Sequence, residues 1–338
     1  MTREERLKLI REIESERESR VLVYITGDRR GLETKIGNDT FPFINRHISQ
    51  FDRPPKIDLF LYSVGGITMA GYSLVNMIRE HTDSFGVLIP FKALSTATLI
   101  TFGSDDIIMT KMGQLSPIDP SLPHPLGPSI PIPGQPDASR VLPVSVEDIF
   151  NYLDLARTEL KISEEDNIES VLEHLSQKVH PLVLGNAYRA REQIELLAHT
   201  LLSYHFESEE KISKIIDIVT KARFSHNYIF NRKEAKNELG LPIIDNDRAE
   251  SLVISLFEKY QQMLELQNPY SPEVALGDQE EARISVDRAI VESDDLTHVF
   301  RTVKILRRST IQVPHMPVPQ PTIIERIISQ GWVEDNNI

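Results

Sequence analysis

Apolar runs and amphipathic stretches alternate along the first 110 residues of the chain. Four compact apolar runs have the length and the β-branched and aromatic content of buried strands, and they cover residues 20–27, 56–63, 84–91 and 105–110. Three stretches between them have helical patterns, at residues 40–51, 68–81 and 95–103. Strands that alternate with helices are typical of a parallel sheet with crossover helices. The pattern therefore predicts an α/β fold.

The amino-terminal segment, residues 1–19, is densely charged but carries a narrow apolar stripe. Leu7, Ile10 and Ile13 recur at helical spacing, which predicts an amphipathic helix that packs on the body of the protein or on another subunit. The segment lacks the apolar stretch of a signal peptide, and the sequence contains no apolar window of about 18 residues. We therefore expect a soluble, cytoplasmic protein without a membrane partner.

The texture of the sequence changes twice after the predicted sheet. Residues 116–144 are rich in proline, which is excluded from helix interiors and central strands, so an extended loop is expected there. Residues 145–222 have helical patterns and predict a helical insert. A helix at 247–266 is followed by two alternating segments that predict a β-hairpin appendage. The expected domains are an amino-terminal helix, a core with the loop and the insert, and a carboxyl-terminal part, at residues 1–19, 20–243 and 244–338.

Composition narrows the classes of function. Acidic residues outnumber basic ones by 50 to 37, and the net charge of −13 disfavours binding to a phosphate backbone, so we expect no nucleic-acid partner. The absence of cysteine excludes disulfides, thiolate metal sites and cysteine nucleophiles. No glycine-rich phosphate loop stands between a strand and a helix. We therefore expect neither a metal nor a cofactor.

Two strand-to-helix junctions combine small residues with candidate chemistry. The first contains Gly65 and Gly66, and paired glycines after a strand let backbone N–H groups approach a substrate carbonyl without obstruction by a Cβ atom. The second contains Ser95, whose hydroxyl precedes a helix. A serine at that place is either a nucleophile or a helix N-cap, and a Gly-Gly pair is either an oxyanion hole or a plain turn. Each junction alone favours the plainer interpretation.

Taken together, the junctions resemble two segments of Clp proteases and of signal peptide peptidase A. The first resembling segment is YSVGGITMAGYSLVNMI, and the second is KALSTATLITFGSDDIIMTKMGQLSPIDP. A third match, Glu234-Ala235 followed by Leu239-Gly240-Leu241, resembles the segment that closes the Clp and crotonase core. The helical insert and the segment SHNYIFNRKEAKNELGLPI most resemble the serine dehydrogenase proteinase family, and the resemblance covers residues 20–243. The resemblance implies a Clp/crotonase-like superhelical core of repeated strand-strand-helix units, and a homo-oligomer.

The resemblance also implies roles for individual residues. Ser95 is the implied nucleophile, the N–H groups of Gly66 and Thr96 form the implied oxyanion hole, and Gly65 allows the turn. The general base does not follow from matching positions. Asp119 stands where the Clp proteases have histidine, and His226-Asn227 stands where they have aspartate.

Two hypotheses address the base. In one, the two roles are exchanged, so that His226 activates Ser95 and Asp119 holds the imidazole, since a triad is defined by geometry and not by chain order. In the other, Lys178 forms a Ser-Lys dyad like that of signal peptide peptidase A. His124 and His180 are further candidates. Each of these residues also has a plain interpretation as a turn, capping or surface residue.

The leading functional hypothesis is a serine endopeptidase that hydrolyses peptides or unfolded proteins through an acyl-enzyme on Ser95 and needs no ATP by itself. One alternative is crotonase-type acyl-CoA chemistry, which is disfavoured because no acidic residue lies between Ser95 and Asp105. Another is an oligomeric scaffold or binding protein that has lost turnover. An activating partner protein is compatible with each of them.

Overall fold

The computed structural model describes residues 2–119, 121–122, 124–132, 135–162, 165–220, 228–312 and 318–338. The chain divides into two compact units, of which unit 1 comprises Met1–Leu115 and Ile229–Ile338 and unit 2 comprises Ser116–Tyr228. Within the described ranges, no helix combines the length and the apolar character needed to cross a membrane.

Unit 1 is built on a seven-stranded sheet with the order β14-β13-β12-β1-β2-β3-β5. Its parallel half confirms the four strands predicted from the apolar runs. These strands are β1 (Arg20–Thr26), β2 (Lys56–Tyr62), β3 (Ser84–Ile89) and β5 (Asp106–Met109). Each is parallel to its neighbour, as expected for strands joined by helical crossovers.

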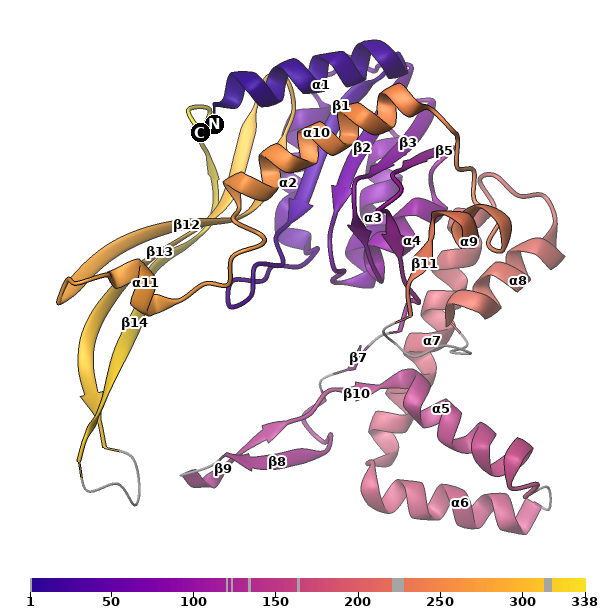
Figure 1. The fold of residues 1–338 in the computed structure, drawn as a ribbon. Coiled ribbons are helices and arrows are strands. Elements are labelled where there is room, and N and C mark those ends of the chain that lie inside the picture. Colours follow the sequence, from indigo (N-terminus) through magenta and orange to yellow (C-terminus); the bar gives the residue numbers. More distant parts are fainter. Residues whose placement is uncertain are drawn as a thin grey trace. The chain divides into compact units, whose positions relative to one another are not determined.

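Helices cover both faces of this parallel half (Figure 1). One face carries α1 (Arg3–Arg17) and α10 (Asp247–Met263). The other carries α2 (Phe41–Ile48), α3 (Thr68–Arg79) and α4 (Thr96–Phe102). The apolar stripe predicted for the amino-terminal helix is buried in a core cluster with α10 and alternate residues of β1. A parallel sheet that is buried on both faces explains why its strands appear as continuous apolar runs.

The carboxyl-terminal strands continue the same sheet. They are β12 (Glu281–Glu292), β13 (Thr297–Ile311) and β14 (Gln320–Glu334), preceded by the short helix α11 (Pro272–Leu276). The predicted β-hairpin is the antiparallel pair β12–β13, and β14 adds a third strand to it. Because β12 pairs antiparallel with β1, from Val23 opposite Glu292 to Thr26 opposite Ala289, the hairpin joins the core sheet.

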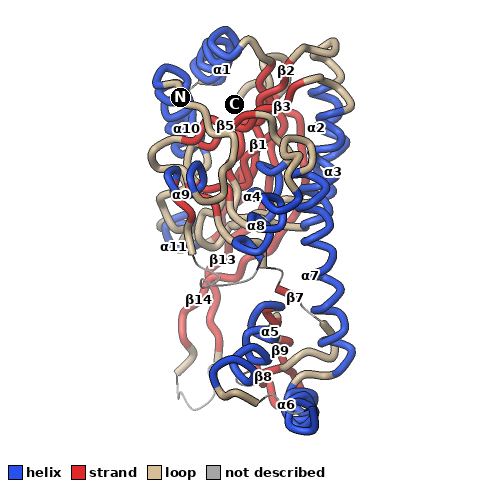
Figure 2. The backbone as a smooth tube through the Cα atoms, turned by 90° about the vertical axis from the view of Figure 1, so that its right-hand side faces the viewer, coloured by secondary structure: helices blue, strands red, loops and turns tan. Residues whose placement is uncertain are grey.

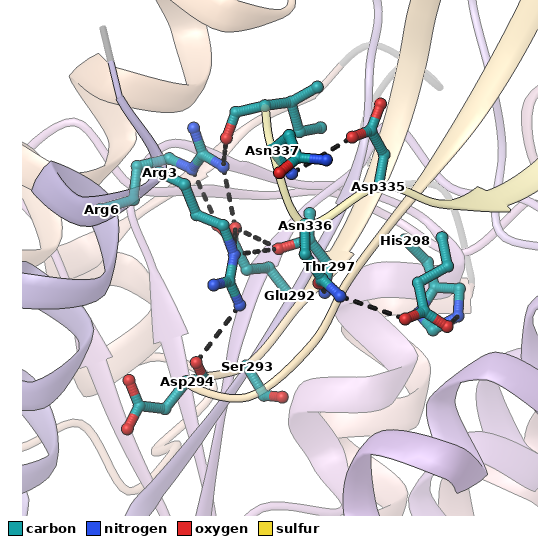
Figure 3. Close-up of polar contacts among 12 residues, drawn as sticks. Arg3, Arg6, Glu292, Ser293, Asp294, Thr297, His298, Asp335, Asn336 and Asn337 are labelled. Atoms are coloured by element: carbon teal, nitrogen blue, oxygen red, sulfur yellow. Dashed lines mark hydrogen bonds and ion pairs between the residues drawn. The ribbon is translucent and has the colours of Figure 1, made fainter.

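A buried polar network fastens α1 to this carboxyl-terminal part (Figure 3). The Arg6 guanidinium donates two hydrogen bonds of 2.8 Å to the carboxylate of Glu292, and the two residues are 1% and 0% exposed. Glu292 also accepts from Thr297 Oγ1 at 2.7 Å and from Tyr260 OH at 2.5 Å. Arg6 Nη2 donates to the carbonyl of Ile338 at 3.0 Å, so residues from both ends of unit 1 lie side by side (Figures 1 and 2).

Short elements of unit 1 complete the surroundings of the strand ends. A three-stranded sheet has the order β11-β6-β4, with β4 (Lys92–Ala93), β6 (Gln114–Leu115) and β11 (Phe230–Asn231). The helix α9 (Arg232–Asn237) begins with a capping box between Asn231 and Glu234. The 3-10 helix η1 (Asn38–Thr40) leads into α2. The glutamate of the third resembling segment is thus a capping residue.

Unit 2 contains the helical insert. Its helices are α5 (Val146–Asp154), the π-helix η2 (Leu155–Glu159), α6 (Glu165–Lys178), α7 (Pro181–Leu202) and α8 (Glu209–Thr220). The proline-rich segment before it is more regular than the extended loop expected. It contains β7 (Ser121–Leu122), β8 (Ser129–Ile132), β9 (Gln135–Val141) and β10 (Val144–Ser145). Among the described residues these strands form two-stranded pairs, and edge strands tolerate proline because its missing N–H can face away from the paired strand.

Candidate active site

The turn after β2 contains Gly65 and is stabilised by hydrogen bonds to the side chain of Ser63. Gly65 has φ +109°, a conformation that side chains with a Cβ rarely adopt. The buried hydroxyl of Ser63 accepts a hydrogen bond from the Gly65 N–H at 3.0 Å and one from Thr26 Oγ1 at 2.7 Å. The end of β1 therefore supports the first glycine of the pair.

Gly66 lies against the backbone of Ile36 in a parallel bridge. Ile36 donates its N–H to the carbonyl of Gly65 at 2.9 Å, and its own carbonyl accepts from the N–H of Ile67 at 2.9 Å. A Cβ on Gly66 would lie 2.2 Å from the Ile36 oxygen, so the close approach requires glycine. Because Gly65 and Ile67 supply the bonds to Ile36, the N–H and the carbonyl of Gly66 face the opposite side.

Ser95 occupies a strained turn immediately before α4. Its backbone angles are φ +52° and ψ −114°, and it is half-buried. Hydrogen bonds on both sides maintain this turn, from Ala97 N–H to the Leu94 carbonyl at 3.0 Å and from Leu99 N–H to the Ser95 carbonyl at 3.1 Å. A non-glycine residue in such a conformation costs of the order of 1–3 kcal/mol. The side chain of Ser95 does not cap α4, which disfavours the N-cap interpretation.

The two turns face one another. A Cβ on Gly65 would lie 2.9 Å from the Cβ of Ser95 and 3.3 Å from its Oγ. The carbonyl of Gly66 accepts a hydrogen bond from Thr96 Oγ1 at 2.9 Å, so the side of Gly66 that faces away from Ile36 is directed toward α4. The structure therefore brings Gly65, Gly66, Ser95 and Thr96 together. The N–H of Thr96, in the first turn of α4, has no acceptor within the helix.

Three further polar residues meet at the carboxyl ends of the parallel strands. Asp28 follows β1, Tyr62 ends β2, and Lys92 begins β4. The Asp28 carboxylate accepts from Tyr62 OH at 2.6 Å and from Lys92 Nζ at 2.7 Å. These three residues are not among the site residues predicted from the sequence. Their positions in the sequence could have indicated them, because each lies within two residues of the end or the start of a strand. The carboxyl ends of parallel strands form the edge where α/β proteins place their sites.

The candidate bases lie outside unit 1 or outside the described residues. Asp119 belongs to unit 2, where its carboxylate accepts from Ser145 Oγ at 2.8 Å and from the Glu147 N–H at 3.4 Å, at the start of α5. Lys178 also belongs to unit 2 and is exposed at the end of α6. His226 and its neighbour Asn227 lie outside the described residues.

The two lesser candidates have local structural roles in unit 2. His180 is the N-cap of α7, and its Nδ1 accepts from the Leu182 N–H at 3.2 Å. His124 Nδ1 accepts from the Leu126 N–H at 3.1 Å within a turn. Both histidines therefore fit the capping and turn interpretation.

Both turns lie in a segment with a known relationship. Residues 1–133 match the family of ClpP-like SDH-type serine proteinases. The resemblance to the serine dehydrogenase proteinase family is thereby confirmed over a range that includes Gly65, Gly66 and Ser95. Together with the parallel strands and their crossover helices, the match confirms the predicted Clp-like α/β fold class, and it supports a peptidase as the type of protein.

Individual relatives share much of the chain. Uncharacterized protein MJ0137 of Methanocaldococcus jannaschii is 27% identical over 266 residues, which are 76% of this chain and 79% of that protein. Among solved structures, ClpP1 from Listeria monocytogenes matches with 16% identity and a TM-score of 0.36, over 70% of this chain and 98% of that one. The membrane-bound stomatin-specific protease 1510-N, in complex with a substrate peptide, matches with 14% identity and a TM-score of 0.37, over 64% and 74%.

Proposed function

We propose that the chain is a serine endopeptidase that hydrolyses peptides or unfolded proteins through an acyl-enzyme on Ser95. The observation that carries this proposal is the strained backbone of Ser95, which holds a half-buried serine opposite Gly65. Strained conformations persist where the surrounding structure maintains them, and they cluster at active sites. The match of residues 1–133 to a serine proteinase family supports the same assignment.

In the proposed reaction, Ser95 Oγ attacks the carbonyl carbon of the scissile peptide bond. The negative charge that develops on the carbonyl oxygen is stabilised by the N–H groups of Gly66 and Thr96, as in other oxyanion holes. The base takes the proton of the serine hydroxyl and transfers it to the leaving amine, and water then hydrolyses the acyl-enzyme by the same route. We propose His226 as this base, oriented by Asp119, with Lys178 as the alternative.

Labelling with a fluorophosphonate probe tests the nucleophile. The wild-type chain is expected to form one covalent adduct that maps to Ser95, and Ser95→Ala is expected to form none while keeping its melting temperature. Ser84→Ala, at the start of β3 in the same unit, is the matched control and should be labelled like the wild type. A folded wild-type chain that stays unlabelled, or an adduct on a different serine, would overturn the proposal.

The same probe identifies the base. His226→Ala is expected to slow labelling of Ser95 by at least about 100-fold, within the range of general-base contributions, because the hydroxyl loses its proton acceptor. His180→Ala, which removes the cap of α7, serves as the control for loss of an imidazole. Unchanged labelling of His226→Ala together with loss of labelling in Lys178→Met would assign the base to the lysine.

Hydrolysis and assembly are tested separately. An endopeptidase that needs no ATP should cleave an unstructured protein into internal fragments without added nucleotide, and light scattering should detect the homo-oligomer that we propose from the family resemblance.

Acyl-CoA chemistry is disfavoured, because α4 contains no carboxylate that could serve as its acid or base. Purification of the chain with bound CoA would favour acyl-CoA chemistry over the peptidase.

A further inference from the structure

Asp28, Tyr62 and Lys92 form a cluster on the side of the sheet that carries α10. The Tyr62 ring packs against Phe257 of α10, with ring centroids 4.9 Å apart, and the residue is 2% exposed. The side chains of Lys92 and Asp28 are 29% and 14% exposed. A carboxylate that accepts from a buried hydroxyl and from an ammonium group at 2.6 Å and 2.7 Å makes strong, charge-assisted hydrogen bonds.

Each donor of the cluster precedes a residue of the candidate site by the same short distance in sequence. Tyr62 stands three residues before Gly65, and Lys92 stands three residues before Ser95. The backbones of these two segments also pair, because the Ser63 N–H donates to the Lys92 carbonyl at 2.9 Å and the Leu94 N–H donates to the Ser63 carbonyl at 3.0 Å. The cluster therefore links the two chain segments that lead into the facing turns at Gly65 and Ser95.

Asp28 has a second connection to the site through its own loop. This loop begins at the end of β1 and reaches Ile36, whose backbone pairs with Gly65 and Ile67. The Thr34 N–H donates to the Gly27 carbonyl at 2.8 Å, which closes the loop on itself next to Asp28. One carboxylate is thus linked to all three segments that form the candidate site.

The Tyr62 hydroxyl keeps its proton and can donate to Asp28 over a wide pH range. Burial, followed by the hydrogen bond to Asp28 and its charge, raises the pKa of Tyr62 well above its ordinary value, so the hydroxyl remains a donor at every pH at which a peptidase would be assayed. Lys92 lies within ion-pair distance of the same carboxylate. Removal of Asp28 would leave a buried hydroxyl and a partly buried ammonium without their shared acceptor.

We propose that Asp28, with Tyr62 and Lys92, is a positioning residue that holds the Gly65–Gly66 turn and Ser95 at the separation required for acyl transfer. The inference rests on the proposed function. It assigns no contact with substrate to Asp28. Displacement of reacting groups by about 1 Å can cost roughly 100-fold in rate. The hydrogen bonds of Asp28 to Tyr62 and Lys92 therefore affect the reaction without touching the substrate.

The test compares Asp28→Asn, Tyr62→Phe and Lys92→Met with Lys56→Met. Lys56 is a matched control, because it is a partly buried lysine of the same sheet that pairs with Asp106 at the opposite ends of the strands. The rate constant for fluorophosphonate labelling of Ser95 is expected to fall about 10- to 100-fold in Asp28→Asn and Lys92→Met. The fall should appear in the maximal rate constant of labelling and not in the probe concentration that gives half of that rate, and Lys92→Arg should restore part of it. Lys56→Met should lower the melting temperature without slowing labelling below that temperature.

A second measurement does not depend on activity. Amide hydrogen exchange at residues 63–67 and 94–96 should accelerate in Asp28→Asn and not in Lys56→Met, if Asp28 holds the two turns. The positioning role is overturned if Asp28→Asn lowers only the melting temperature, or if Lys56→Met slows labelling equally. A wild-type chain that is never labelled would instead refute the proposed peptidase, and the exchange data would still decide the positioning role.

Discussion

At the scale of single residues, the candidate site depends on two backbone conformations. Gly65 and Ser95 both have positive φ, and a Cβ added to Gly65 would lie 2.9 Å from the Cβ of Ser95. Glycine is required at position 65 for two separate reasons, its conformation and the absence of space beside Ser95. These two reasons can be separated by comparison with another glycine of positive φ.

Gly65→Ala is expected to destabilise unit 1 by about 1–3 kcal/mol and to abolish labelling of Ser95, because the new Cβ would displace the serine. Gly277→Ala is the matched control, since Gly277 has φ +57° but no atom within 4 Å of its ideal Cβ position. Melting temperatures and labelling rates of both variants distinguish conformation from contact. Equal labelling in the two variants would show that the space beside Ser95 is unimportant.

The sequence pointed to Gly65, Gly66, Ser95 and Thr96 because their segments resemble known ones, and the structure brings these residues together. It gave no such indication for Asp28, Tyr62 and Lys92. Their neighbourhood arises from the register of three strands that are distant in sequence, and no local pattern specifies which side chains meet across a sheet. Their importance is visible only after the strands are aligned.

At the scale of elements, the helices and the parallel strands could be predicted because their apolar residues have a clear period. The continuation of the core sheet by β12 could not, since pairing between residues as far apart as Val23 and Glu292 leaves no local signal. The amino-terminal helix shows the same limit. Its apolar stripe predicted packing, but the structure also attaches the helix through the buried charged residue Arg6.

Arg6→Ala is expected to lower the free energy of unfolding by about 3–5 kcal/mol, because the buried carboxylate of Glu292 loses both charge-assisted hydrogen bonds from Arg6 and keeps only the longer contact with Arg3, at 3.8 Å. Arg11→Ala is the control on the same helix, since Arg11 pairs with Asp294 at the surface and should change the melting temperature much less. Chemical denaturation of the two variants measures the difference. Similar effects of both substitutions would contradict an attachment through the buried pair.

At the scale of the whole molecule, buried histidines of unit 1 connect stability to pH. His47 of α2 is 0% exposed, and its ring nitrogens lie 2.8 Å from Ser293 Oγ and 2.9 Å from His298 Nδ1 (Figure 3 shows Ser293 and His298). Burial lowers the pKa of His47 to about 3, and burial also lowers the pKa of His298. Both rings are therefore neutral in the folded protein at pH values at which they are protonated in the unfolded chain.

The unfolded state binds more protons below the ordinary histidine pKa, so stability must decrease as the pH falls from about 6.5. Each buried histidine contributes a slope of up to about 1.4 kcal/mol per pH unit. His47→Gln is expected to reduce the slope of unfolding free energy between about pH 5 and 6.5, above the range in which most carboxyl groups titrate. A slope that His47→Gln does not alter would assign the acid sensitivity to other groups.

The left-handed backbone at Ser95 also bears on how this sequence can change over evolutionary time. Glycine would adopt the same conformation without strain, so Ser95→Gly offers a gain of folding stability of the order of 1–2 kcal/mol that alanine does not. A lineage released from selection on the hydroxyl would drift toward glycine at this position.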